Sequence, residues 1–67
     1  MSTVPGWYEI HFFNKSGKEI GLTDQPIPPS IGDKANVHFN PGNRFRVIDR
    51  EFDYTRGLYV IITLDVD

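Results

Sequence analysis

The sequence predicts a small all-β domain, in which five antiparallel strands form a meander that closes into a barrel, with no helix beyond a single turn. Three observations predict this fold class. Residues 58–66 alternate apolar and other side chains with the period of two that is typical of a strand. Turn-forming Asn, Gly and Pro residues separate five segments that favour strands. No ten-residue window carries apolar residues at the three- and four-residue spacing of a helix.

The first two predicted strands form a hairpin. Residues 7–13 are rich in the aromatic side chains that strands favour. Their alternation gives two faces, with Tyr8, Ile10 and Phe12 on one and Trp7, Glu9, His11 and Phe13 on the other. Residues 14–17 begin with Asn and end with Gly, which is typical of a turn. The chain is then expected to return as a short strand at residues 19–22.

A proline-rich connector is predicted at residues 23–32. Its prolines fix φ and lack an amide hydrogen, so the stretch should be extended and outside any central strand. Ile27 and Ile31 are its expected anchors on the core. A third strand is predicted at residues 34–39, and the Asn-Pro-Gly-Asn sequence at 40–43 favours a type II turn.

Residues 45–54 form the fourth predicted strand, and their alternation changes phase. Phe45 and Val47 share one face, whereas Ile48, Phe52 and Tyr54 share the other. An extra residue in the strand, near Ile48–Asp49, would bring all five side chains to the core. The sequence therefore predicts a β-bulge and a sharp bend at this point.

Residues 58–66 form the last predicted strand, and with residues 45–54 they make the spine of the barrel. The residues expected to face the core are Leu58, Val60, Ile62, Leu64 and Val66. Tyr59 and Ile61 are expected to face outward. The strand is longer than a small barrel requires, so a free edge at residues 58–66 is a candidate site for homodimer formation.

Length and composition predict one domain over residues 1–67, with a flexible N-terminus at residues 1–6. The chain has no cysteine, which is consistent with a reducing cytoplasm. Its start lacks the basic and apolar regions of a signal peptide. The longest wholly apolar run, Val60–Ile62, is far shorter than the ~20 residues of a membrane span. We therefore expect a cytoplasmic protein without a membrane partner.

No segment matches a catalytic, cofactor-binding or metal-binding pattern. His11 and His38 have no recognisable ligand spacing with Glu9 or Asp33. The acidic residues do not form a calcium loop, and the glycines do not form a phosphate-binding loop. The sequence thus predicts a protein that is not an enzyme and needs no cofactor.

The preferred function is a non-catalytic protein-binding module. Large apolar side chains that a small barrel leaves outside its core usually mark a contact surface. The residues predicted to make this contact are Trp7, Phe13, Tyr59 and Ile61, with Arg46 and Arg50 at the rim. Alternatively, a second layer or a strand-swapped dimer would cover these same side chains.

Two other functions remain open at this point. All four arginines lie within residues 44–56, so Arg44, Arg46 and Arg50 could form a basic stripe on one strand face. A nucleic-acid-binding barrel would use the basic residues Lys34, His38, Arg44, Arg46 and Arg50 around a stacking Phe39 or Tyr54. The net charge of −2 disfavours this alternative. The other open function is that of a structural, self-assembling small subunit.

Residues 27–66 resemble a recurrent pattern in short proteins of bacteria, phages and mobile elements. The sequence Ile-Pro-Pro-Ser-Ile-Gly-Asp at residues 27–33 precedes a strand, a tight turn and the strand at residues 45–54. In those proteins, a final strand closes a Src-homology-3-like barrel. Ala35 departs from the pattern, which usually has a larger aliphatic residue there. The resemblance implies the fold and a phage or mobile-element origin. A binding module of that origin would dock on or inhibit a host protein, and inhibition of a defence nuclease by acidic side chains that imitate phosphates is a special case of this hypothesis. It transfers no site residue.

Overall fold

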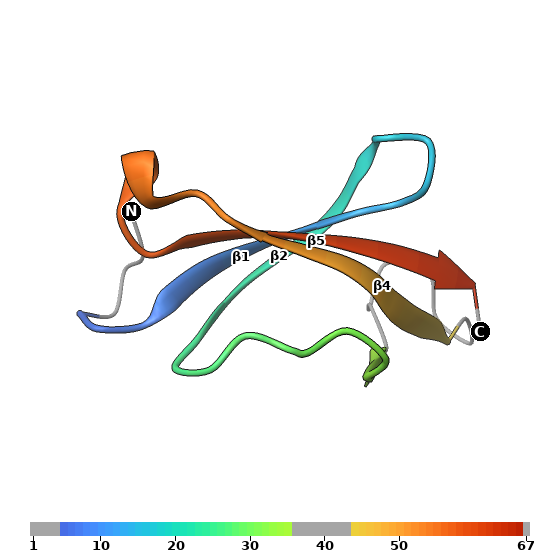
Figure 1. Ribbon diagram of the computed structural model, residues 1–67, viewed down its shortest axis with the longest axis horizontal. Helices are drawn as coiled ribbons and strands as arrows, with labels where there is room; N and C mark the ends of the chain where they lie inside the picture. The colour runs from blue at the N-terminus through green and yellow to red at the C-terminus, as the bar shows by residue number, and fades with distance from the viewer. Residues whose placement is uncertain (1–4, 36–43, 67) are drawn as a thin grey trace.

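The computed structural model describes residues 5–35 and 44–66, and it is all-β (Figure 1). Its strands are β1 (Tyr8–Phe13), β2 (Glu19–Gln25), β3 (Lys34–Ala35), β4 (Phe45–Phe52) and β5 (Tyr59–Val66). A single 3-10 turn, η1 (Tyr54–Arg56), connects β4 to β5. The prediction of an all-β domain with five strands and no helix beyond a single turn is therefore confirmed. β2 extends three residues beyond its predicted end, and residues 36–39 of the third predicted strand lie outside the described residues.

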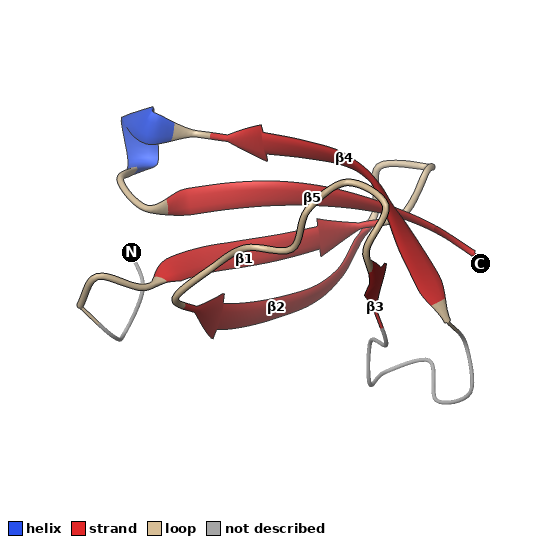
Figure 2. Ribbon diagram, turned by 60° about the horizontal axis from the view of Figure 1, so that its bottom comes forward, coloured by secondary structure: helices blue, strands red, loops and turns tan. Residues whose placement is uncertain are grey.

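The five strands form one sheet in the order β2-β1-β5-β4-β3, which curls into a half-barrel (Figure 2). Three neighbouring pairs are antiparallel, as predicted. The pair β1 and β5 is parallel, so the prediction of a purely antiparallel meander is wrong. Strands from the two ends of the described chain thus lie side by side in the middle of the sheet. None of the described helical residues forms a helix long and apolar enough to cross a membrane.

β5 is the central strand of the sheet, with β1 on one side and β4 on the other. The prediction that residues 58–66 offer a free edge is therefore wrong. Its aliphatic residues Val60, Ile62 and Leu64 are almost completely buried in the core. The edges of the described sheet are β2 and the two-residue β3.

The core lies on the concave face of the sheet. It is made of apolar side chains from four strands: Ile10, Phe12, Ile20, Phe45, Val47, Val60, Ile62 and Leu64. Leu58 and Val66 were predicted to face the core but are exposed, because they lie at the two ends of the β5 pairing. The connector is anchored by buried Pro28, whereas Ile27 and Ile31 are exposed, contrary to prediction.

The predicted bulge in β4 is confirmed, since the register with β5 shifts between Val47 and Asp49. β4 turns sharply midway along its length (Figure 2). Val47 before the bulge is buried, and Phe52 after it is half-buried on the same side. Ile48 and Tyr54 are exposed, contrary to prediction, because Ile48 is the extra residue of the bulge and Tyr54 lies beyond the strand in η1.

Candidate functional site

The convex face of the sheet carries most of the predicted contact residues. Phe13 and Ile61 are half-buried there, and Trp7, just before β1, is partly exposed. Tyr59 is only 9% exposed. Tyr59 lies on the face opposite the core, as the alternation predicts, but other side chains cover it almost fully, and its neighbours explain why.

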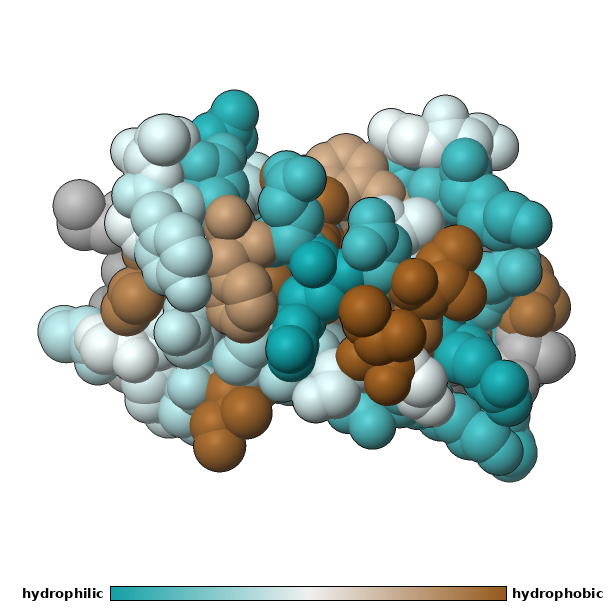
Figure 3. All heavy atoms as spheres, in the orientation of Figure 1, coloured by the Kyte–Doolittle hydropathy of each residue, from teal (hydrophilic) through white to brown (hydrophobic). Residues whose placement is uncertain are grey.

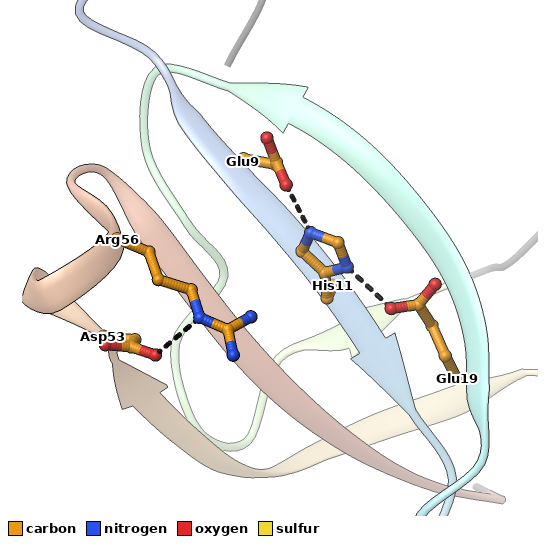
Figure 4. Close-up of polar contacts among 5 residues, drawn as sticks. All are labelled: Glu9, His11, Glu19, Asp53 and Arg56. Atoms are coloured by element: carbon orange, nitrogen blue, oxygen red, sulfur yellow. Dashed lines mark hydrogen bonds and ion pairs between the residues drawn. The ribbon is translucent and has the colours of Figure 1, made fainter. Parts of the chain in front are cut away.

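His11 lies between two carboxylates on this convex face (Figure 4). Its Nε2 atom is 2.6 Å from Oε2 of Glu9, and its Nδ1 atom is 2.6 Å from Oε1 of Glu19 on β2. Ionised carboxylates only accept hydrogen bonds, so both ring nitrogens must donate, which requires the imidazolium form. Both nitrogens are thus occupied, and neither is available to a metal. Within the described ranges, no group of three or more His, Cys, Asp or Glu side chains is arranged to hold a metal ion.

The electrostatics of this cluster favour the charged histidine. Partial burial lowers the pKa of His11, but the hydrogen bonds to Glu9 and Glu19 outweigh burial and raise that pKa above its ordinary value. The hydrogen bond from His11 in turn lowers the pKa of Glu9. We call Glu9, His11 and Glu19 the histidine clamp, because it joins β1 to β2.

Tyr59 is covered by the histidine clamp and by η1. The His11 ring stacks on the Tyr59 ring with centroids 4.4 Å apart and an interplanar angle of 27°. The Arg56 guanidinium lies 4.9 Å from the same centroid, and its Nε atom is 3.3 Å from Oδ2 of Asp53. These contacts make Tyr59 part of the packing of the convex face. The parallel pairing of β1 with β5 brings His11 onto Tyr59, and no local pattern in the sequence indicates that pairing.

A second group of aromatic side chains begins at the far end of β4. The rings of Phe52 and Tyr54 stack with centroids 5.8 Å apart and an interplanar angle of 9°. Tyr8 meets Phe52 edge-on at 5.8 Å, and the Arg50 guanidinium lies 5.1 Å from the Phe52 centroid. Tyr54 is 72% exposed. The result is a ladder with an ordered arginine at one end and an exposed tyrosine at the other.

The proline-rich connector lies against this ladder. Arg50 Nη1 donates to the Pro29 carbonyl at 3.3 Å and to Ser30 Oγ at 3.5 Å. Residues 32 and 33 are bonded to the main chain of Val47, which fixes the connector on β4. Ile27 and Ile31, on either side of this contact, are 77% and 62% exposed. We call Arg50, Phe52, Tyr54, Ile27 and Ile31 the strip face. Figure 3, from the side on which β4 and the connector lie in front, shows apolar patches separated by hydrophilic side chains.

The basic residues of the nucleic-acid alternative do not form one stripe. Lys34 and Arg46 are opposite each other on β3 and β4, and Arg44 is exposed just before β4. In the register of β4 with β5, Arg46 lies opposite Asp65 on the convex side, whereas Arg50 lies opposite Ile62 on the concave side. The bulge between them shifts the phase by one residue, so the predicted stripe is split between the two faces. His38 and Phe39 lie outside the described residues.

Comparison of the chain with protein-family models, with curated proteins and with solved structures gives no match.

Proposed function

We propose that this protein is a non-catalytic protein-binding module and that the strip face is its contact surface. The main support for this proposal is that the exposed Tyr54 stacks on Phe52, over whose ring the Arg50 guanidinium lies. Tyrosine and arginine are enriched among the residues that dominate interface energies. Side chains already ordered by mutual stacking lose little conformational entropy when a partner binds.

Burial favours the strip face over the convex face. Tyr59 has little surface left to offer, and its neighbours His11 and Arg56 are engaged in packing on it. Trp7, Phe13 and Ile61 remain the alternative contact surface. Arg50 belongs to the strip face, whereas Arg46 lies on the convex side.

The experiment compares two exposed apolar residues on opposite faces. Leu22 is 58% exposed and pairs with His11 on the convex side, so it is a matched control for Tyr54. In affinity capture from the native host, Tyr54→Ser should weaken partner binding by about 2 kcal/mol, which is roughly thirtyfold. Leu22→Ser should leave binding unchanged. If only Leu22→Ser lost capture of the partner, the contact surface would be the convex face and not the strip face.

The resemblance in residues 27–66 extends this proposal. The partner would be a host protein that a phage-encoded or mobile-element-encoded chain docks on or inhibits, in the cytoplasm. The half-barrel would correspond to a Src-homology-3-like barrel, with the connector at residues 26–33 bridging β2 and β3. The hydrogen bonds between that connector and Val47 support this closure.

Binding of single-stranded nucleic acid is a second candidate, favoured by the same ladder. Bases stack on exposed aromatic rings, and an adjacent arginine adds a cationic contact. The net charge of −2 and the separation of Arg46 from Arg50 weigh against it. Fluorescence polarisation with single- and double-stranded oligonucleotides should show no binding even at low salt. Salt-sensitive binding that Tyr54→Ser abolishes would support this candidate instead.

A further inference from the structure

We infer that the partner presents a carboxylate flanked by apolar side chains, and that Arg50 receives it. This inference rests on the proposed function, because it specifies the partner of the strip face. It starts from the environment of Arg50, which differs from that of Arg56. Arg56 has Asp53 as an ion-pair partner at 3.3 Å. Among residues 5–35 and 44–66, Arg50 has no carboxylate within 4.0 Å.

Arg50 is held in one position without being neutralised. Its Nη1 atom bonds to Pro29 and Ser30, and its planar group lies over Phe52. These contacts use one nitrogen and one face of the guanidinium. No described residue bonds to its Nε or Nη2 atom. A half-buried cation loses hydration and gains no opposite charge in return, which is unfavourable unless a partner supplies one.

Asp33 of the connector and Asp49, the residue before Arg50, accept hydrogen bonds from main-chain amides. Asp33 Oδ2 accepts a hydrogen bond from the Ser30 amide at 2.8 Å, and Asp49 Oδ1 accepts one from the Arg50 amide at 2.9 Å. In the strand register, Asp49 lies opposite Thr63 on the convex side, away from the guanidinium. The unpaired edge of Arg50 therefore suits a carboxylate from another molecule, bound through two parallel hydrogen bonds.

The surroundings of Arg50 define the rest of the ligand. Ile27 and Ile31 are exposed on the connector side, and Tyr54 is exposed on the other side. A partner that covers them must carry apolar groups beside its carboxylate. The ligand class is thus a peptide segment with Asp or Glu next to large aliphatic or aromatic residues. A basic segment would be repelled by the positive charge of Arg50 and should bind more weakly.

The test is a selection of displayed random decapeptides on the folded protein, followed by NMR titration of the best synthetic peptide. Enriched sequences should contain Asp or Glu beside Leu, Ile or Phe and should shift the amide signals of Arg50, Phe52 and Tyr54. Replacing the peptide's acidic residue by its amide should weaken binding about tenfold. The variant Arg50→Gln should bind the acidic and amide peptides equally.

Arg44→Gln is the matched control, because it removes the same charge from an exposed arginine outside the strip face. It should retain the tenfold preference for the acidic peptide. If peptides bind the strip face with no acidic preference, or if Arg44→Gln also abolishes that preference, the inference about Arg50 is overturned while protein binding stands. If no peptide is enriched, or if titration shifts only convex-face signals such as those of Leu22 and Ile61, the proposed contact surface itself is overturned. The amide spectrum of each variant reports whether it is folded.

Discussion

The side chain of His11 connects three strands of the sheet. Its ring bridges Glu9 on its own strand and Glu19 on β2, and it stacks on Tyr59 of β5. The sequence placed His11 and Glu9 on one strand face, which is correct. It could not indicate the approach of Glu19 or Tyr59, because these contacts depend on the hairpin register and on a parallel pairing between distant segments.

The histidine clamp predicts a pH dependence of stability. The folded-state pKa of His11 is raised, so its stabilising contribution is fully present below the unfolded pKa of about 6.5 and is lost as pH rises through the folded pKa. Losing one hydrogen bond to a charged group should cost about 1.5–3 kcal/mol. Urea unfolding between mildly acidic and alkaline pH should show this decline in the wild type and a flatter profile in His11→Gln.

At the acid end the sign reverses for Glu9. Its folded-state pKa is lowered, so its contribution is present above its unfolded pKa and is lost as pH falls through the folded value. Stability should therefore be highest between the titrations of Glu9 and His11. Equal pH slopes for the wild type and His11→Gln between neutral and alkaline pH would show that the clamp does not form in solution.

Two tyrosines five residues apart should differ in their effect on stability when truncated. Tyr59 is buried against His11 and Arg56, so Tyr59→Ala should cost about 3 kcal/mol by analogy with other buried aromatic residues. Small domains have only ~3–5 kcal/mol to lose, so much of this variant should be unfolded. Tyr54 is exposed, and Tyr54→Ala should change the free energy of unfolding by less than about 0.5 kcal/mol. Chemical denaturation of both variants tests the assignment, and equal losses would contradict it.

At the scale of elements, the bulge in β4 is the irregular feature that the sequence predicted correctly. The phase change between Val47 and Ile48 indicated the bulge, because a strand cannot otherwise turn Phe45 and Phe52 to the same side. A basic stripe of Arg44, Arg46 and Arg50 required unbroken alternation, and the bulge interrupts that alternation between Arg46 and Arg50. The pairing of β1 with β5 lay beyond the sequence, since consecutive hairpins were the simplest topology and nothing local distinguishes a parallel partner.

The bulge itself can be tested by deleting Ile48. Without the extra residue, either Phe45 and Val47 or Arg50 and Phe52 must turn to the convex face, because a shift of one residue reverses every side chain. We expect this deletion to unfold the domain, as judged by loss of amide dispersion in the NMR spectrum. Ile48→Ser keeps the residue count and changes only an exposed side chain, so it should cost less than about 0.5 kcal/mol. A folded deletion variant would mean that the bulge can be moved without penalty.

At the scale of the molecule, the two faces of one curled sheet have different roles. The convex face uses its charged and aromatic side chains on one another, in the histidine clamp and in the packing on Tyr59. The concave face buries the apolar core, and at its margin β4 and the connector present the strip face. The composition shows a surplus of aromatic residues. It could not show on which face these side chains would pack against one another and on which face they would be exposed.

The remaining question at this scale is whether the molecule associates through its edge. Because β5 is central, the long edge of the described sheet is β2, which carries Glu19 and Asp24 and is followed by Pro26. Charged residues and proline on an edge oppose pairing with a second copy. We therefore expect sedimentation at the 7.7 kDa mass of the monomer.

Asp24→Val should raise self-association, since it removes an edge charge and favours strand pairing. Asp65→Val is the matched control, because Asp65 lies on central β5 and its ion pair with Lys15, at 3.6 Å between exposed side chains, contributes little to stability. Both variants lose the same charge, so a general reduction in repulsion would affect them equally. If sedimentation shows association only for Asp24→Val, the negative charge on the β2 edge is what prevents that edge from pairing with a second copy. Association of both variants, or of the wild type, would mean that the β2 edge charges do not keep the protein monomeric.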